Sequence, residues 1–254
     1  MKEKYIGQRI IRPDALAKVT GQAQFAADIA VHRGDLLHAK ALYPPYGHAR
    51  ILSIDTSEAE RMPGVVCVMT AKDLPASCTN KYGADEPDKP IFAENKIVYE
   101  GDAVAAVAAE TLAQAEAAVA KIRVTYEPLP AYEDPRALRE IYPSPIHENH
   151  PISGQSPISL SATVKNGDPA PAFERADVVL DHWYRTPMVD HAYIEPDVCI
   201  VEPDPVQGGF TIWSPQHAVQ NAKQDMAKLF GLPQSKVRVI GTLAGGGFGG
   251  KEDS

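Results

Sequence analysis

The chain has 254 residues, of which 44% are hydrophobic, so it is long enough for one large domain or two of ordinary size. Its 33 acidic and 25 basic residues give a formal net charge of -8, which argues against nucleic acid or an anionic membrane as a partner. No terminal stretch resembles a targeting signal and no apolar run is long enough to cross a bilayer, so we expect a cytoplasmic protein.

The first half of the sequence alternates strand-like runs with short helical segments. Strands are predicted at 36–42, 51–55, 65–70, 103–109 and 124–126, with one helical turn at 56–61. Residues 76–90 are polar and contain proline, which predicts an exposed loop. This mixture predicts an α+β or α/β unit of roughly 110 residues, a typical domain size.

One helix of this half has a clear start signal. The spacing of Thr111 and Gln114 is that of a capping box, and it predicts a helix that continues to Ile122. Helical periodicity predicts a sheet-facing side that carries the small residues Ala113, Ala117 and Ala120.

The second half begins with an irregular, proline-rich stretch at 131–157, where we place a linker and the domain boundary. Beyond it, Asp168 and Pro169 predict a short helix that ends at Arg175. Three strands, expected to be antiparallel, are predicted at 178–185, 193–201 and 210–213. Ser214 and Pro215 then predict the cap of a helix over 216–230, and a strand over 237–240 leads into the final residues.

Three cysteines, Cys67, Cys78 and Cys199, are an odd number, and no two are spaced as a metal-ligand pair. We therefore expect neither a disulfide framework nor an iron-sulfur cluster held by this chain alone. Each is interpreted as a small hydrophobic residue, so a redox centre must come from elsewhere.

The densest motif is residues 245–254, where five glycines surround Phe248 and Lys251 and Glu252 follow. Glycine costs backbone entropy, so this density predicts positive φ angles or a close approach of a ligand, often an anionic one. The residue types of this run fit two phosphate-binding motifs, but the required context of each motif is missing. The dinucleotide motif lacks its following helix, and the ATP-binding P-loop needs a hydroxyl where Glu252 places a carboxylate that would repel phosphate.

Together with Ser214, Pro215 and Gln216, the run 245–252 resembles the molybdenum-cofactor subunit of the xanthine dehydrogenase and aldehyde oxidase family. Other segments resemble the amino-terminal hammerhead domain of that family, namely 14–21, 54–59, 63–65 and 124–131. Residues 167–168 and 191–195 resemble the opening of its molybdopterin-binding domain. The resemblance covers nearly the whole chain in the order of the family.

This resemblance implies an α+β fold class, with a mixed α/β hammerhead domain followed by the first α+β portion of a molybdopterin-binding domain. The expected organisation is a lead segment, the hammerhead domain, a proline-rich linker and an incomplete molybdopterin-binding domain, at 1–17, 18–132, 133–157 and 158–254.

The resemblance also implies roles for named residues. The cofactor-binding set would be Gln216, Gly246, Gly247, Phe248 and Gly249. Gln216 would hydrogen-bond an oxygen ligand of molybdenum, and the glycine run would lie against the metal and the pterin, with no direct metal ligand in this chain. From the residues alone, the favoured interpretation of Gln216 is a solvated residue in the first turn of a helix, and the family position reverses this preference. The alternative for Phe248 is a core anchor between glycines, a role compatible with a place beside the cofactor.

Glu252 matches the position of a substrate-positioning carboxylate in purine-hydroxylating members, and we assign it as the catalytic candidate. Its alternative interpretation is a solvated acid. His191, Tyr193 and Glu195 share one face of a predicted strand by alternation. A metal site at His191 and Glu195 stays open, although a packed or substrate-channel face is favoured.

The function implied is that of a molybdenum hydroxylase, which oxidises an aromatic heterocycle, with a purine such as xanthine favoured, or an aldehyde. Water would supply the oxygen, and electrons would pass to 2Fe-2S and FAD centres on other subunits. The molybdenum-molybdopterin cofactor, with its cytosine dinucleotide form left open, would be shared with a partner chain.

The general base of the family is absent from these residues, so we expect the chain to be inactive alone. Its expected partners are a chain that completes the molybdopterin domain, an iron-sulfur subunit, an FAD subunit and a small-molecule substrate. The alternative is a non-catalytic assembly module or a truncated remnant of such a subunit.

Overall fold

The computed structural model describes residues 5–83, 87–131, 134, 146–147 and 162–252. Its contacts divide the chain into two units, Met1–Pro130 with His191–Ser254, and Ala131–Asp190. Most of the predicted linker at 133–157 therefore lies outside the described residues. No helix in the described ranges has the length and apolar character needed to cross a membrane.

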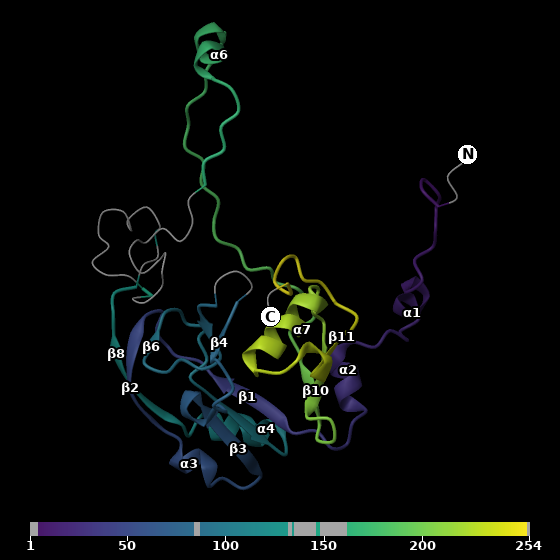
Figure 1. Ribbon diagram of the computed structural model, residues 1–254, viewed down its shortest axis with the longest axis vertical. Helices are drawn as coiled ribbons and strands as arrows, with labels where there is room; N and C mark the ends of the chain where they lie inside the picture. The colour runs from purple at the N-terminus through teal and green to yellow at the C-terminus, as the bar shows by residue number, and fades with distance from the viewer. Residues whose placement is uncertain (1–4, 84–86, 132–133, 135–145, 148–161, 253–254) are drawn as a thin grey trace. The chain divides into compact units, whose positions relative to one another are not determined.

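The first half of the larger unit contains two three-stranded sheets and a short hairpin (Figure 1). The antiparallel sheet of order β1-β7-β3 is formed by His38–Leu42, Ala105–Ala109 and Val65–Thr70. The antiparallel sheet of order β6-β2-β8 is formed by Lys96–Ile97, Ala49–Asp55 and Arg123–Pro128. The hairpin pairs β4 (Lys81–Tyr82) with β5 (Lys89–Pro90). The predicted strands of this half are confirmed, but the loop expected at 76–90 contains this hairpin.

The first half also contains short helices, and each predicted helix of this half is present. They are α1 (Ala15–Val19), α2 (Ala26–Val31), α3 (Ser57–Glu60), the 3-10 turn η1 (Ala71–Asp73) and α4 (Leu112–Val119). Of these, α3, η1 and α4 pack on the strands of this half. The hydroxyl oxygen of Thr111 accepts the N–H of Gln114 at 3.3 Å, so the capped start of α4 is confirmed.

The buried face of α4 differs from the predicted one. Ala115 and Ala118 are fully buried against β1 and β7, whereas Ala113, Ala117 and Ala120 are exposed. Alanine occupies both faces of this helix, so its periodicity carried no information about orientation. The larger side chains Val107 and Ile122 complete the core beneath the helix.

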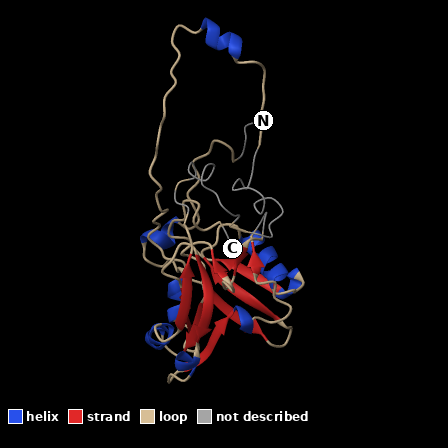
Figure 2. Cartoon of the chain, turned by 90° about the vertical axis from the view of Figure 1, so that its left-hand side faces the viewer, coloured by secondary structure: helices blue, strands red, loops and turns tan. Residues whose placement is uncertain are grey.

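The last part of the larger unit is a three-stranded sheet of order β11-β10-β9, with one helix beside it (Figure 1). Figure 2 distinguishes the strands of the chain, in red, from its helices, in blue. Its strands are β9 (Ile200–Asp204), β10 (Gly209–Ser214) and β11 (Val237–Gly241). The helix α7 (Val219–Leu229) packs on β11, and the 3-10 turn η2 (Gln234–Lys236) precedes that strand. β9 is antiparallel to β10 as predicted, but β11 is parallel to β10 because α7 forms a crossover connection between them.

The smaller unit contains the predicted short helix, α6 (Ala170–Arg175), which follows Pro169. The strand predicted over 178–185 is wrong. Val178, Leu180 and Trp183 are 75%, 83% and 90% exposed, and no described strand pairs with this segment. An apolar, β-branched run has the propensity for a strand, but without a hydrogen-bonding neighbour it stays extended and irregular. The strand predicted over 193–201 likewise begins only at Ile200.

The mixture of helices and short sheets confirms the predicted α+β fold class.

Candidate cofactor site

The parallel pairing of β10 and β11 brings two distant parts of the sequence to one sheet edge. Ser214 at the end of β10 pairs with Gly241 at the end of β11, and the N–H of Thr242 donates to the carbonyl of Ser214 at 3.0 Å. Because the carboxyl ends of parallel strands lie at the same edge, the loop after Ser214 and the glycine run leave the sheet together. The sequence predicted that both segments belong to the cofactor site, and the sheet topology explains why they lie side by side.

Gln216 lies in the loop between β10 and α7 and not in the first turn of a helix. The predicted helix start at residue 216 is therefore wrong, since α7 begins at Val219. Two hydrogen bonds shape this loop: the N–H of Ala218 donates to the Gln216 side-chain oxygen at 3.3 Å, and the N–H of His217 donates to the Lys251 carbonyl at 2.8 Å. The second bond ties the Gln216 loop to the end of the glycine run.

The glycine run takes the left-handed conformations that its composition predicted. Gly246, Phe248 and Gly249 have φ angles of 101°, 52° and 98°. A positive φ is uncommon for a non-glycine residue and marks a position that the surroundings enforce. Phe248 is 76% exposed, so the interpretation of this ring as a core anchor is wrong.

Several N–H groups of the run have no acceptor in the part of the chain that the structure describes. Within the described residues, the N–H of Gly250 donates to the Gly247 carbonyl at 2.7 Å, whereas those of Gly246, Gly247, Phe248 and Gly249 donate to nothing. Free backbone donors in a run with left-handed residues can bind an anion or an oxo group. The donor set therefore fits the anionic cofactor that the sequence predicted.

Glu195 and Lys251 form a buried ion pair beneath the glycine run. Lys251 Nζ lies 2.8 Å from Glu195 Oε2, and the two side chains are 1% and 12% exposed. The same Oε2 accepts the N–H of Gly245 at 2.6 Å. No local sequence pattern predicts this pair, because its two residues are 56 positions apart.

The strand face predicted for His191, Tyr193 and Glu195 is wrong, because residues 191–199 form no strand. Glu195 instead faces Lys251, and the Tyr193 ring centroid lies 4.6 Å from Lys251 Nζ. Among the described residues no group of His, Cys, Asp and Glu side chains could hold a metal ion. The open metal-site hypothesis at His191 and Glu195 therefore has no support in the described part of the chain.

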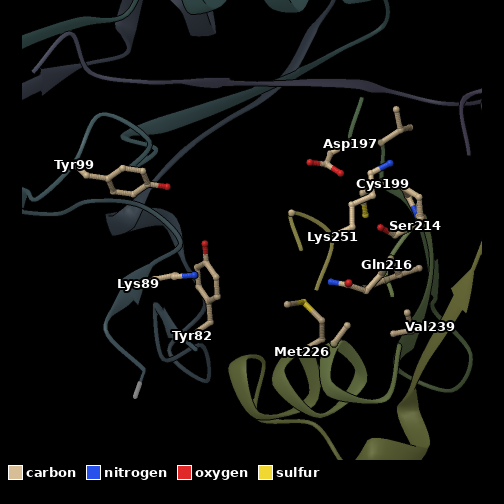
Figure 3. A pocket seen from close by; sticks show the side chains of 15 residues that line it. Tyr82, Lys89, Tyr99, Asp197, Cys199, Ser214, Gln216, Met226, Val239 and Lys251 are labelled. Atoms are coloured by element: carbon tan, nitrogen blue, oxygen red, sulfur yellow. The ribbon is translucent and has the colours of Figure 1, made fainter. Parts of the chain in front are cut away.

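A cavity of about 450 Å³ adjoins Gln216 (Figure 3). The Gln216 amide and Met226 face Tyr82 and Lys89 across it. Its remaining polar lining includes Tyr99, Asp197, Cys199, Ser214 and Lys251. The aromatic residues on its far wall were not predicted, since they belong to the segment 76–90 and its neighbour, interpreted from the sequence as an exposed loop.

Burial sets the ionisation of two groups that line this cavity. It raises the pKa of the half-buried Tyr82 hydroxyl, with the nearby charge of Lys89 opposing the shift, and desolvation raises the pKa of the Cys199 thiol although the residue as a whole is exposed. Both groups are therefore neutral at pH 7, and Tyr82 presents a hydroxyl that can donate a hydrogen bond.

The remaining predicted site residues lie outside this cavity. Glu252 is exposed and directly follows the buried Lys251. Gly246, Gly247, Phe248 and Gly249 are also absent from the lining. The structure thus joins Gln216 to the glycine run through the backbone, while the substrate role of Glu252 stays a prediction.

Comparison with known proteins gives matches along the chain. The aldehyde oxidase and xanthine dehydrogenase a/b hammerhead domain family matches residues 20–130, and the molybdopterin cofactor-binding domain family matches residues 150–254. A probable xanthine dehydrogenase subunit of Bacillus subtilis is 36% identical over 244 residues, which cover 96% of this chain and 31% of that protein. The nicotinate dehydrogenase large molybdopterin subunit of Eubacterium barkeri is 34% identical, covering 98% of this chain and 56% of that protein.

The fold is also found among solved structures. The aldehyde oxidoreductase of Desulfovibrio gigas superimposes with a TM-score of 0.77 at 32% identity, over 92% of this chain and 26% of that chain. The 254 residues thus span about a third to about half of the curated relatives named above.

Proposed function

Because the chain belongs to the xanthine dehydrogenase and aldehyde oxidase family, we propose that its residues form one wall of a molybdenum-molybdopterin site in a hydroxylase. The cofactor, when bound, supplies the two-electron redox chemistry that transfers an oxygen atom from water to a carbon atom of the substrate. The wall comprises the Gln216 loop and the glycine run 245–250, which leave the same sheet edge.

The observation that carries this proposal is the set of free N–H groups at Gly246, Gly247, Phe248 and Gly249, which have no acceptor within the described residues. Gly246 and Gly249 have positive φ angles, and as glycines they add no side chain to the run beside these donors. Such donors stabilise negative charge without having to reorganise. Gln216 adds a side-chain amide that can donate to an oxygen of the cofactor.

Glu252 would position the substrate. A carboxyl group accepts a hydrogen bond from a ring N–H, or donates one to a ring nitrogen when it is protonated, so it suits a nitrogen heterocycle. We therefore favour a purine such as xanthine, or a related nitrogen heterocycle, over an aldehyde.

The remaining parts of the enzyme lie outside these 254 residues, because the curated relatives are about two to three times as long by the coverage given above. We propose that further residues, in the same polypeptide or in a partner, complete the molybdopterin domain and supply the general base. Iron-sulfur and FAD centres on other subunits would receive the electrons.

The domain boundaries proposed for this chain are 18–132 for the hammerhead domain and 158–254 for the start of the molybdopterin-binding domain. Cys67, Cys78 and Cys199 are all free, as is usual in the reducing cytoplasm, where we place the complex.

The test is to purify the native complex, identify its polypeptides by mass spectrometry and measure molybdenum and iron. Reduction of its redox centres by xanthine, nicotinate and an aldehyde is then followed under anaerobic conditions. The proposal predicts that both metals are present and that a nitrogen heterocycle is the best reductant. A complex without molybdenum would contradict it and would favour the assembly role.

A further inference from the structure

We propose that Glu195 and Lys251 act as a positioning clamp, which sets the conformation of the glycine run 245–250 before the cofactor binds. This inference rests on the proposed function, and it adds two residues that contact neither the metal nor the substrate in that proposal. Their task is to hold the free N–H groups where a ligand can use them.

The clamp connects both ends of the run to one carboxylate. At the start of the run, the N–H of Gly245 donates to Glu195 Oε2 at 2.6 Å. At its end, Lys251 Nζ donates to the same Oε2 at 2.8 Å and to the Glu195 carbonyl at 3.0 Å. The residues between these anchors therefore form a closed loop whose ends cannot separate while the ion pair is intact.

This closure explains how an unfavourable backbone persists. Phe248 has a φ angle of 52° although it is not glycine, and its ring is 76% exposed, so its own packing does not hold it there. A residue in this region of φ keeps its conformation only when the surroundings over-determine it. Here the surroundings are the two anchors on Glu195 and the hydrogen bond from Gly250 N–H to the Gly247 carbonyl, 2.7 Å long.

Close packing leaves the loop little room to rearrange around the clamp. A Cβ atom on Gly245 would lie 2.5 Å from the Cβ of Glu195, and one on Gly250 would lie 2.7 Å from Cε1 of Tyr193. The Tyr193 ring also faces Lys251 Nζ, with 4.6 Å between Nζ and the ring centroid. Because both residues are glycine, the loop can pack directly against Glu195 and Tyr193.

A role in geometry fits the energetics of a buried pair. A buried ion pair pays a desolvation cost that often matches its attraction, so it contributes little net stability, whereas loss of one partner leaves a costly unpaired charge. Glu195 Oε1 is buried without a hydrogen-bond partner in the described part of the chain, which adds to that cost. The pair therefore stabilises the fold less than an apolar contact would. We infer that it is present because it fixes the geometry of the loop.

The experiment uses the complete complex, purified both with cofactor and from cells that cannot make molybdopterin. The variants are Glu195→Gln, Lys251→Met, their combination and Lys251→Arg. The matched control is Lys121→Met, which breaks an ion pair to Glu58 of the same 2.8 Å length on the surface. Hydrogen exchange of peptides covering 245–251 is measured in the cofactor-free protein, and molybdenum content and its paramagnetic resonance signal are measured in the loaded protein.

In the cofactor-free protein, we expect exchange in 245–251 to be faster by roughly tenfold or more in Glu195→Gln and Lys251→Met, because a charged hydrogen bond is lost. The double variant removes both charges, so it should recover thermal stability but keep fast exchange and low molybdenum. Lys251→Arg keeps the positive charge, so it should contain more molybdenum than Lys251→Met. Lys121→Met should match the wild type in loop exchange and in molybdenum content.

Three results would overturn the clamp. The first is unchanged exchange in the single variants, and the second is exchange in the double variant that recovers together with its stability. The third is normal molybdenum content with an unaltered resonance signal despite fast exchange. Failure of the proposed function gives a different result from failure of the clamp, because the wild-type complex itself would then lack molybdenum. Hydrogen exchange of the loop in the cofactor-free protein would still decide whether the clamp exists.

Discussion

The N–H of His217 donates to the carbonyl oxygen of Lys251 at 2.8 Å and joins the Gln216 loop to the end of the glycine run. The two segments are separated by a helix and a strand, so this bond exists only because β10 and β11 pair in parallel. One edge of a small sheet thus gathers an amide side chain, free backbone donors and a buried ion pair.

Replacing Gly249 should remove molybdenum with little further effect on the fold. Gly249 has a φ angle of 98°, which a β-branched residue does not readily adopt, so Gly249→Val should shift the adjacent donors. The matched control is Gly208→Val in the turn between β9 and β10, where φ is 70° and nothing lies within 4 Å of an added Cβ. Both variants should lose stability by about 1–2 kcal/mol, the cost of a left-handed residue.

Metal analysis of the two purified complexes distinguishes an effect on cofactor binding from an effect of backbone strain alone. Gly249→Val should lose most of its molybdenum and Gly208→Val should keep it. Equal metal in both would remove Gly249 from the cofactor site.

Glu252 should matter for heterocycles and not for cofactor retention. Glu252→Gln keeps the shape of the side chain but removes its charge and changes its hydrogen-bonding pattern. We expect kcat/KM for a nitrogen heterocycle to fall by roughly 10- to 100-fold, the value of one hydrogen bond to a charged group, with unchanged molybdenum. An aldehyde substrate serves as the internal control, and a similar fall for both substrates would argue against a positioning role.

The Glu58 carboxylate gives a pH-dependent contribution to stability whose sign is fixed by its partners. The hydrogen bond from Lys121, aided by its charge and by Arg123, holds the pKa of Glu58 below its usual value of 4.5. Because the pKa is depressed in the folded state, the contribution is present above the unfolded pKa and is lost as the pH falls through the folded pKa.

Unfolding midpoints of the wild type and Glu58→Gln should therefore differ slightly at pH 7 and converge in acid. The difference at pH 7 should also shrink with added salt, since the pair is exposed. A difference that grows below pH 4.5 would have the wrong sign for this assignment.

The core cluster that includes Ile97 of β6 should contribute strongly to the stability of the hammerhead part. Ile97 is fully buried in a cluster with Ala49, Ala93 and Val104, so Ile97→Ala should cost about 2–5 kcal/mol through lost transfer energy and the cavity left behind. Leu52→Ala on β2 is the control, because Leu52 is 61% exposed. Chemical denaturation measures both variants, and equal losses would mean that the cluster is not a cooperative core.

Local signals in the sequence predicted local structure well. The capping box at Thr111, the alternation in 51–55 and the glycine density of 245–250 each reflect short-range physics, and each corresponds to an element or conformation of the fold. The sequence could also predict that Gln216 and the glycine run belong to one site, through the resemblance of both segments to one family.

Features that depend on distant partners could not be predicted in this way. The segment 178–185 has strand propensity but no described neighbour to pair with, and the orientation of α4 depends on the sheet beneath it. The Glu195–Lys251 pair forms only after β10 and β11 are aligned, so neither residue shows a local sign of it. Tyr82 and Lys89 line the cavity for the same reason, because the hairpin that carries them meets its opposite wall only in the folded chain.

The most direct test of the central claim is the molybdenum content of the native complex carrying Gln216→Ala. The control is Gln207→Ala in the exposed turn between β9 and β10, where the same amide is removed far from the sheet edge that carries the site. We predict that the wild type and Gln207→Ala contain equal amounts of molybdenum and that Gln216→Ala contains much less. Equal molybdenum and equal activity in all three complexes would contradict the assignment of this edge as a wall of the cofactor site.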